Sequence, residues 1–470
     1  MNSESSMKKI LLISYFFPPD SAVGGLRIAR FARHLPSFGW TPLVLTIQDR
    51  HRVRLDKERS KDLQGVTIYQ TDRLPTVRDG YLLAKTILRG GKIANSSVHS
   101  HTPDLHGKPT GNEKVMQKLK RYFISLFVFL PDEDKNWVIP AALKAVSEIR
   151  SQKIDCILTS GPPHSTHLIG LLAKKITNVR WVADLRDPWV DFLPYRSALG
   201  RSALSDRIEQ WMEGRVVRRA DRVITTTPEL KQVMEKRYAK EPGDKFVSIL
   251  NGIDAEKFVS PDQPEKYAKF TIAYAGALYE GRTPEPLFEA IKKLISENKI
   301  TPSQISVKLF GDCQAIDGRP TISIARSYGL DGVVEVSGTI PYSEAINTMR
   351  RSHLLLLLVP SIHHLCIPAK VYDYFGVGTR ILALTEEGAT AELLKATKGG
   401  EFFSPHDITG ISDHIYMLMQ AENKHLLTID PARYAQFDGK LLTRQLADQL
   451  SAAAGQAGPV TCCEKEEVLR

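Results

Sequence analysis

The sequence predicts an α/β protein built from two Rossmann-like, doubly wound domains that face each other across a ligand-binding cleft. Three observations lead to this fold class: the length of the chain, two sets of alternating strands and helices, and a turn-rich linker between the sets. The chain has 470 residues, about three times the ~150 residues expected of one domain. Because 42% of its residues are hydrophobic, the composition is that of a globular protein able to bury more than one core.

The first set begins close to the N-terminus with a strand, a glycine loop, a helix and a second strand. The strand covers residues 8–16, the helix runs from Gly24-Gly25 to about Phe38, and the second strand covers 43–47. Apolar residues recur at helical spacing in the helix, which predicts a βαβ unit. The strand-to-helix order returns in three later segments, at 154–173, 181–186 and 222–238. Such alternation predicts a mostly parallel sheet.

The second set starts with an apolar strand at 270–275 that ends at Gly276, followed by a helix near 286–297. Four further strands continue the alternation, at 307–310, 333–337, 354–359 and 380–384. An Asn-Gly turn at 251–252, followed by a proline-dotted stretch, marks the linker between the sets. Ligands of doubly wound sheets bind at the carboxyl ends of the strands, so we expect the ligand between the two domains.

The predicted boundaries place the first domain at 1–252 and the second at 253–435. Residues 89–115 are rich in Gly, Ser, His and Asn and are expected to form a mobile loop, with histidines at no metal-binding spacing. Residues 455–470 are expected to form a disordered tail.

The charge balance favours anionic partners. The formal net charge is +10, from 63 Lys and Arg against 53 Asp and Glu. Nucleic acid, a membrane surface and phosphorylated small molecules all fit such an excess. The basic residues are scattered and no nucleic-acid recognition module is present, so we expect no nucleic acid partner.

Cysteine use and hydropathy point to the cytoplasm. The five cysteines are an odd number without zinc-ligand spacing, which is typical of thiols in a reducing compartment. A lysine pair and an apolar run at 8–17 resemble a signal peptide, but prolines follow without a small-residue cleavage site, which favours a first strand. Apolar runs stay well below the ~18 residues of a membrane span. The basic and aromatic segment 114–130 fits a helix docked on an anionic bilayer and a buried core helix equally.

Glycines and arginines after the first strand form a candidate ligand site. Gly24 and Gly25 would let the backbone approach a ligand, and the helix that follows would attract an anion; a plain tight turn is the alternative. Their spacing differs from the GxGxxG fingerprint, which disfavours NAD. Arg27 and Arg30 lie one turn apart and fit either phosphate binding or a solvated basic face.

The most informative stretch is 367–374, which follows an apolar strand and has a proline at the first helical position. A lysine in a first helical turn opposes the helix dipole unless an anion lies there, so Lys370 is a candidate diphosphate ligand. Asp373 could accept from ribose hydroxyls, or form an exposed pair with Lys370. Gly276 ends the first strand of the second domain. Arg282 follows it in the same loop and could bind phosphate or be an exposed surface arginine.

Two strand ends of the first domain carry polar side chains where chemistry is expected. His164 follows one strand, either as a ligand of the substrate or as a structural histidine that caps a helix. Asp184, Arg186 and Asp187 follow another, where Asp184 and Arg186 could equally form a structural ion pair. The sequence at 132–134 has the form of a DxD metal motif, but a solvated acidic turn is favoured.

In their order and spacing, these motifs resemble the family-four glycosyltransferases of the GT-B fold, which are retaining enzymes that use sugar nucleotides. The resemblance covers about residues 7–450. It also rests on Asp132…Trp137, Asp221-Arg222-Val223-Ile224-Thr225-Thr226, Asn251-Gly252-Ile253-Asp254, Tyr274-Ala275-Gly276 and Pro368-Ala369-Lys370-Val371-Tyr372-Asp373-Tyr374. The resemblance implies a donor nucleotide mainly in the second domain, an acceptor in the first, and a last helix at 436–454 that crosses back to the first domain.

On this resemblance we base a hypothesis for the roles of the candidate residues. His164, Asp187, Arg282 and Lys370 would be catalytic, with Arg282 and Lys370 stabilising the leaving diphosphate. The donor would be bound by Gly24, Gly25, Gly276, Arg282, Lys370 and Asp373. Arg27 and Arg186 would lie on the acceptor side. Because these cations supply the positive charge, we expect no metal and no cofactor beyond the nucleotide sugar as co-substrate.

The implied acceptor is a carbohydrate or a lipid-linked glycan precursor, with a cytoplasmic location that extends to the inner face of an anionic membrane. Many family members carry two glutamates eight residues apart, whereas Leu365 and Asp373 stand at those positions here. A sugar-nucleotide epimerase of the same fold would convert the donor without an acceptor. Because Leu365 replaces a glutamate of the family, it favours the alternative hypothesis of a non-catalytic protein that binds nucleotide sugars.

Overall fold

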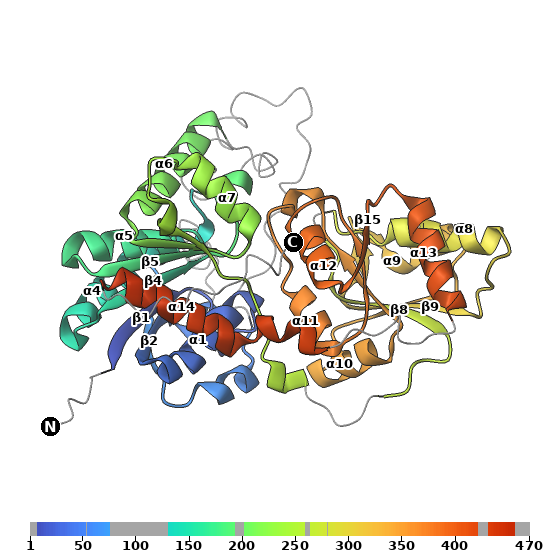
Figure 1. Cartoon of the computed structure of the whole chain (residues 1–470), viewed down its shortest axis with the longest axis horizontal. Helices are drawn as coiled ribbons and strands as arrows, with labels where there is room; N and C mark the ends of the chain where they lie inside the picture. Colours follow the sequence, from blue (N-terminus) through green and yellow to red (C-terminus); the bar gives the residue numbers. More distant parts are fainter. Residues whose placement is uncertain are drawn as a thin grey trace, which may run out of the picture. The chain divides into compact units, whose positions relative to one another are not determined.

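The computed structural model describes residues 7–52, 54–75, 130–192, 202–258, 264–279, 281–421 and 431–455. The described residues fall into two compact units (Figure 1). The N-terminal unit extends to Leu250 and takes up the chain again from Gly439, and the C-terminal unit is Asn251–Asp438. Three segments with predictions lie outside the described residues: the loop at 89–115, the basic segment 114–129 and the tail from 456.

The N-terminal unit contains a seven-stranded sheet whose strands are all parallel, in the order β3-β2-β1-β4-β5-β6-β7. The strands are β1 Lys8–Ser14, β2 Trp40–Ile47, β3 Thr67–Thr71, β4 Cys156–Gly161, β5 Arg180–Leu185, β6 Arg222–Thr225 and β7 Phe246–Ser248. The strand order reverses between β1 and β4, which pair directly. The predicted strands of this domain are therefore confirmed.

Helices cover this sheet as the βαβ pattern predicts. They are α1 Leu26–His34, α4 Val138–Gln152, α5 Thr166–Thr177, α6 Ala203–Arg219, α7 Pro228–Arg237 and α14 Gly439–Ala453. The helix predicted to reach Phe38 is α-helical only to His34 and continues as the 3₁₀ helix η2, Leu35–Phe38. Pro36 explains the change, because its ring nitrogen cannot donate the next α-helical hydrogen bond.

The C-terminal unit contains a six-stranded parallel sheet in the order β12-β9-β8-β13-β14-β15. The strands are β8 Phe270–Ala277, β9 Ile305–Asp312, β12 Val334–Ser337, β13 Leu354–Leu358, β14 Ile381–Leu384 and β15 Gly400–Phe403. A short antiparallel pair, β10 Ala315–Ile316 and β11 Arg319–Pro320, follows β9. The predicted class, two doubly wound α/β domains, is thus confirmed for each sheet.

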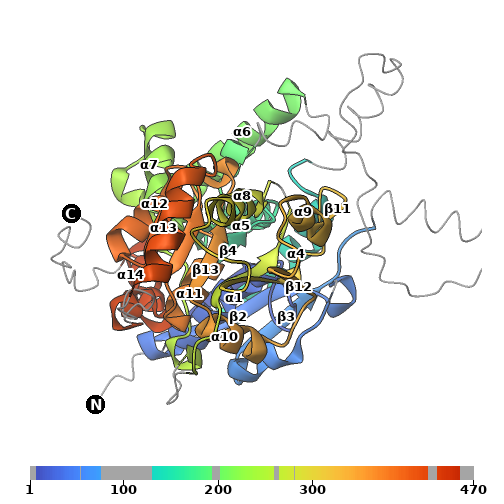
Figure 2. The same ribbon diagram turned by 90° about the vertical axis from the view of Figure 1, so that its right-hand side faces the viewer.

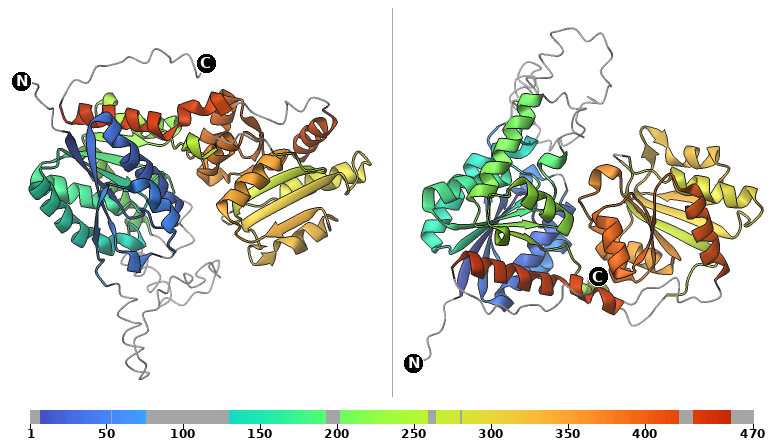
Figure 3. Two further views of the ribbon diagram at one scale, coloured as in Figure 1. Left: turned by 90° about the horizontal axis from the view of Figure 1, so that it is seen from below. Right: turned by 45° about the horizontal axis from the view of Figure 1, so that its top comes forward.

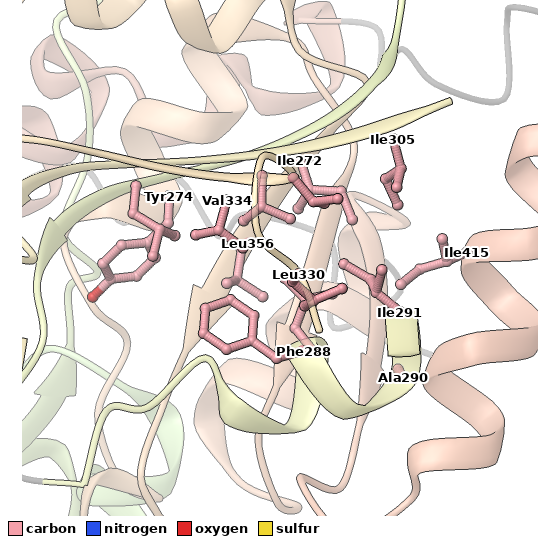
Figure 4. Packing of buried hydrophobic residues seen from close by; sticks show 14 of the residues in the cluster. Ile272, Tyr274, Phe288, Ala290, Ile291, Ile305, Leu330, Val334, Leu356 and Ile415 are labelled. Atoms are coloured by element: carbon pink, nitrogen blue, oxygen red, sulfur yellow. The ribbon is translucent and has the colours of Figure 1, made fainter. Parts of the chain in front are cut away.

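The helices of the C-terminal unit are α8 Glu285–Ser296, α9 Thr321–Ser327, α10 Tyr342–Arg351, α11 Lys370–Val377, α12 Ala389–Thr397 and α13 Ile408–Gln420. Helices α8 and α13 pack against each other (Figure 2), and α10 packs against α11. The core between the sheet and α8, α9 and α13 includes Ile272, Phe288, Leu356 and Ile415, each fully buried (Figure 4). Alternate strand positions and one face of each helix supply these residues, as amphipathic elements require.

The last helix of the chain, α14, belongs to the N-terminal unit. It packs against α1, and Figures 1 and 3 show the two helices side by side. Leu442, Leu446 and Leu450 are 3% exposed or less and lie in the same core cluster as Ile28 and Phe31 of α1. Within the described ranges, no helix is long and apolar enough to cross a bilayer.

Candidate functional site

In the C-terminal unit, the strand order reverses between β8 and β13. Ligands of doubly wound sheets bind at the carboxyl ends of the strands beside such a reversal. Gly276 lies at the end of β8, and α11, which follows β13, begins at Lys370. The hydroxyl of Tyr374 donates to the carbonyl of Leu356 at 3.1 Å and accepts from the amide of Ala275 at 3.3 Å. These bonds fix α11 against both strands.

Two glycines bring the ends of β8 and β9 close together. Gly276 and Gly311 are paired across the strands and have φ angles of +148° and +111°, which residues with a side chain rarely adopt. A Cβ atom on Gly311 would lie 2.2 Å from the carbonyl oxygen of Gly276, and a Cβ on Gly276 would lie 2.5 Å from the Nζ of Lys370. The lysine ammonium therefore lies directly over bare backbone.

Lys370 carries a positive charge that its surroundings do not neutralise. Its Nζ lies 4.0 Å from the ring centroid of Tyr274, a cation–π contact. Burial, and then the nearby charge of Arg282, lower the pKa of Lys370 to about 7, against smaller opposing effects of Cys313 and Asp373. Among the described residues, no hydrogen bond or ion pair reaches the ammonium. Figure 4 shows Tyr274 at the margin of the hydrophobic core, with its hydroxyl directed away from the labelled isoleucines.

Arg282 is the second cation at this strand end. Its guanidinium lies 4.3 Å from the ring centroid of Tyr279, and its buried Nη1 has no hydrogen-bond partner within the described part of the chain. Two neighbouring cations, bare backbone and the N-terminus of α11 together form a place where an anion would be stabilised. The geometry fits the phosphate-binding predictions for Lys370, Arg282 and Gly276.

Three residues beside this site went unassigned in the sequence, although two lay in motifs at strand ends. Tyr274 supports the ammonium, and Gly311 permits the close approach of β9. Cys313 is fully buried and donates its thiol hydrogen to the carbonyl of Gly276 at 3.2 Å. Burial raises the pKa of Cys313 to about 12, which favours the neutral thiol. Leu365, where the resemblance expects a glutamate, is 7% exposed.

In the N-terminal unit, the ends of β1, β4 and β5 lie next to one another. Gly24 and Gly25 precede α1 in the 3₁₀ helix η1, Val23–Gly25. A Cβ on Gly24 would lie 2.9 Å from the Nη1 of Arg186, and a Cβ on Gly25 would lie 3.1 Å from the Cα of Phe17. Both glycines are thus closely packed against the protein itself, and their contact with a donor stays a prediction.

Arg27 departs from the prediction of an acceptor-side or solvated residue. It is 4% exposed and forms a bidentate ion pair with Asp184, through Nε at 3.1 Å and Nη2 at 3.0 Å. It also donates to the carbonyls of Ile249 and Leu250 at 2.9 and 2.8 Å. Ser160 donates its hydroxyl to Asp184 at 2.7 Å. Arg27 is thus a structural residue, and it is the ion-pair partner of Asp184 in place of Arg186.

Arg186 joins the loops that follow β1 and β4. Its guanidinium donates to the carbonyls of Gly24, Gly161 and Pro162. Burial lowers the pKa of Arg186, while the nearby charge of Asp187, which is half-buried, acts in the opposite direction. Because its donors are directed at protein carbonyls, this side chain positions the surrounding loops, and its contact with an acceptor stays a prediction.

His164 lies in an aromatic stack at the end of β4. It is 2% exposed, and its ring is parallel to that of Trp189 with a centroid distance of 4.9 Å. Trp189 in turn donates its indole hydrogen to Glu209 at 2.9 Å. The neighbouring His167 bonds through Nδ1 to Thr159 at 2.9 Å, and burial lowers the pKa of His167 to about 3, which keeps it neutral. The stack fixes His164, and its contact with substrate stays a prediction.

The acidic segment at 132–134 starts the 3₁₀ helix η5, Glu133–Trp137, with Glu133 exposed and with Asp132 and Asp134 half-buried. Asp132 accepts from the amide of Ser165 at 2.7 Å, and so caps the start of α5. Burial, and then the charge of Asp132, raise the pKa of Asp134 to about 7, against a hydrogen bond from Tyr15. Across the described ranges, no group of three His, Cys, Asp or Glu side chains could hold a metal ion. The expectation that no metal is needed stays a prediction.

Comparisons with known proteins agree with this architecture. Residues 97–257 match the model of Glycosyltransferase Family 4. The structure is similar to a glycosyltransferase from Rickettsia africae ESF-5, with a TM-score of 0.56, 14% identity and coverage of 95% of this chain and 98% of that one. It is also similar to a lipopolysaccharide outer core galactosyltransferase in its apo form, with a TM-score of 0.56, 10% identity and coverage of 94% and 99%.

A third similar structure is a putative UDP-N-acetylglucosamine 2-epimerase from Listeria monocytogenes, with a TM-score of 0.53, 12% identity and coverage of 95% and 98%. No curated protein sequence matches the chain. At these identities, the similar structures establish the fold and nothing finer.

Two doubly wound units, each with a parallel sheet, and the similarity to solved glycosyltransferases place the chain in the GT-B fold class. Within that fold class, residues 97–257, about a third of the chain, match the Glycosyltransferase Family 4 model, so this segment is similar to the family-four glycosyltransferases. The comparisons confirm the resemblance to GT-B glycosyltransferases expected from the sequence motifs, whereas retention of the anomeric configuration stays a prediction.

Proposed function

We propose that the protein transfers a sugar from a nucleoside diphosphate donor to an acceptor, with retention of the anomeric configuration. The observation that carries the proposal is the pair of cations at the β8–β13 reversal, Lys370 and Arg282. Neither forms an ion pair with a carboxylate among the described residues. The Nζ of Lys370 lies over the backbone of Gly276, and Arg282 is near enough for its charge to lower the pKa of Lys370. A diphosphate supplies the negative charge that this arrangement lacks.

The same cations would act on the reaction itself. Negative charge grows on the diphosphate as its bond to the anomeric carbon breaks, and preorganised cations stabilise that charge. Arg282 can bind two phosphate oxygens at once, and Lys370 adds a point charge. Because the pKa of Lys370 is about 7 in the free protein, an arriving diphosphate would raise it and secure the protonated form. Asp373, one turn along α11, would accept from the ribose.

The N-terminal unit would take the acceptor, a carbohydrate or lipid-linked glycan precursor of polysaccharide or glycolipid synthesis. His164, held by the stack with Trp189, would contact the donor sugar or the developing cation. Asp187 would line the acceptor side, while Arg186 fixes the loops around it. Gly24 and Gly25 would approach the phosphates through their backbone.

A sugar-nucleotide epimerase is the second candidate, because one of the similar structures bears that description. The family-four domain favours transfer. An epimerase would convert the donor without any acceptor, whereas a transferase would release the nucleotide in step with acceptor modification. A non-catalytic protein that binds nucleotide sugars would do neither.

The decisive experiment is thermal stability against UDP, GDP, ADP, CDP and their common sugar conjugates. A ligand at 100 times its dissociation constant adds about 2.7 kcal/mol of stability. We expect one nucleotide to stabilise the wild type, and Lys370→Ala and Arg282→Ala to weaken that nucleotide about ten-fold or more. Lys292→Ala is the matched control. Lys292 belongs to α8, and its Nζ lies 5.9 Å from the ring centroid of Tyr328, away from the candidate site.

Equal stabilisation of the wild type, Lys370→Ala and Arg282→Ala would show that the diphosphate binds elsewhere. With the donor identified, release of its nucleotide is measured with and without glycan acceptors. Release that depends on an acceptor supports transfer, and conversion of the donor sugar by itself supports the epimerase.

A further inference from the structure

We propose that the exposed face of α6 docks the N-terminal unit onto an anionic lipid bilayer. This face goes beyond the proposed sugar transfer and lies on a different unit from Lys370 and Arg282. Its side chains combine arginine with tryptophan and aliphatic residues, and we call it the α6 stripe. The stripe consists of Leu204, Arg207, Ile208, Trp211, Arg215, Arg218 and Arg219.

The stripe occupies one face of the helix because its members recur every three or four residues. Trp211 is 58% exposed and Leu204 is 48% exposed. The four arginines are exposed, and Ile208 is half-buried at the edge of the face. Helix α6 packs against α5 on its other side (Figure 1). The stripe is thus a solvent-facing surface with large apolar groups, which folding of the unit does not require.

The charges of α6 are sorted between its two faces. Of its three acidic residues, Glu209 and Glu213 are fully buried, and Asp206 is half-buried on the side of the helix opposite the α6 stripe. Glu213 accepts from Tyr238 at 2.7 Å and from Arg237 at 2.9 Å, and Glu209 accepts from the indole of Trp189. No acidic residue interrupts the stripe, and its arginines form no ion pair within the described part of the chain. Within the described part of the chain, the exposed face therefore carries positive charge that no carboxylate neutralises.

Trp211 identifies the partner as a bilayer surface. The structure describes all five tryptophans of the chain, and the other four are 1% exposed or less. The guanidinium of Arg215 lies 5.6 Å from the ring centroid of Trp211. Tryptophan favours the headgroup level of a membrane, where one part of the ring is apolar and another is wet. Arginines around it would bind lipid phosphates, and stable binding of a peripheral helix needs both signals.

Two other partners fit less well. A second copy of the chain would bring the same unpaired arginines together, and like charges oppose such a dimer. Duplex DNA supplies phosphates, but its paired bases offer no place for Leu204 and Trp211, which lie in line with the arginines. An anionic bilayer satisfies the charged and the apolar members of the stripe at once.

The four buried tryptophans make Trp211 a direct probe of docking. We expect vesicles of phosphatidylcholine with about 30% phosphatidylglycerol to shift the emission to shorter wavelength and to reduce quenching by acrylamide. Pure phosphatidylcholine vesicles should leave both unchanged, and added salt should weaken the effect. An emission that anionic vesicles do not alter would overturn the proposal. So would an equal shift with inorganic phosphate, or a larger one with duplex DNA at the same phosphate concentration.

The arginines are tested with the triple variant Arg207→Gln, Arg215→Gln, Arg218→Gln. Each arginine near an anionic surface contributes about a five-fold gain in binding, so we expect vesicle binding to fall about a hundred-fold. The matched control removes three exposed lysines of the same unit, with Lys175→Gln, Lys236→Gln and Lys240→Gln. The control should stay within a few-fold of the wild type, and an equal loss in both variants would refute a specific stripe.

The outcome is independent of the sugar-transfer proposal. The triple arginine variant should keep the full thermal stabilisation by nucleotide, since Lys370 and Arg282 are unchanged. A protein that binds vesicles and no nucleotide would contradict the proposed function and leave the α6 stripe standing. A protein that binds nucleotide but no vesicles would contradict the membrane proposal and leave the proposed function standing.

Discussion

At the scale of single residues, the protonation of Lys370 determines how donor binding responds to pH. Its pKa of about 7 lies below the usual 10.5, and a bound diphosphate would raise it again. Below pH 7 the lysine is protonated both free and bound, so the affinity is constant. Above pH 7, binding takes up a proton, and the affinity should fall up to ten-fold for each pH unit.

Calorimetric titration of a nucleoside diphosphate sugar between pH 6 and 9 measures this dependence, because the diester-like phosphates of such a donor do not titrate there. Lys370→Arg is the control, since arginine stays charged throughout and should give a flat profile. A wild-type affinity that is equally flat would place Lys370 outside the diphosphate site.

The buried pair of Arg27 and Asp184 leads to a stability prediction. Asp184→Asn leaves the guanidinium buried without its charge partner, which should lower the free energy of unfolding by about 3–5 kcal/mol. Asp62→Asn is the comparison, because Asp62 and Arg33 form a more exposed pair at 3.8 Å, worth about 0–1 kcal/mol. Denaturant unfolding measures both. A loss in Asp184→Asn no larger than in Asp62→Asn would contradict the structural role of Arg27.

The two basic residues also show what sequence can predict at this scale. Lys370 was predicted from local rules, because a lysine in a first helical turn after an apolar strand needs an anion nearby. Arg27 was not, because its partner lies 157 positions further along the chain. Nothing in the spacing of Arg27 and Arg30 distinguishes a buried ion pair from a solvated face. Pairings of this kind depend on tertiary packing.

At the scale of elements, strands were easier to predict than the ends of helices. The strand at β13 is a run of five leucines, Leu354–Leu358, which is typical of a strand buried on both faces of a parallel sheet. Helix α1 ended early because of one proline, Pro36. Gly311 was visible as a strand-end glycine, but its contact with β8 follows from the register of the two strands.

That contact can be tested by substitution of Gly311. Gly311→Ala would place a Cβ atom 2.2 Å from the carbonyl of Gly276, so β9 must move away from β8. We expect a loss of stability and about ten-fold weaker nucleotide binding, because the backbone under Lys370 shifts. Gly318→Ala is matched in backbone strain, since Gly318 has a φ of +78° but nothing within 4 Å of a Cβ. It should cost about 1 kcal/mol and leave binding unchanged.

At the scale of the whole molecule, the two units have separate cores and should respond separately to core mutations. Leu446→Ala in α14 removes a fully buried side chain from the N-terminal core, at a cost of about 2–5 kcal/mol. Hydrogen exchange should show lost protection in β1 and β4 and unchanged protection in β8 and β9. Leu356→Ala, in the C-terminal core, should lower the protection of β8 and β9 and leave that of β1 and β4 unchanged. Equal loss in both sheets would show that the units unfold as one.

Helix α14 also has a consequence for synthesis on the ribosome. The N-terminal unit needs Leu442, Leu446 and Leu450 to complete its core, yet the whole of the C-terminal unit, residues 251–438, is translated before them. The apolar surface that α14 covers in the N-terminal unit therefore stays exposed while the ribosome synthesises nearly two hundred further residues. Nascent chains stalled before residue 439 should bind holdase chaperones through this face and release them once α14 has left the exit tunnel.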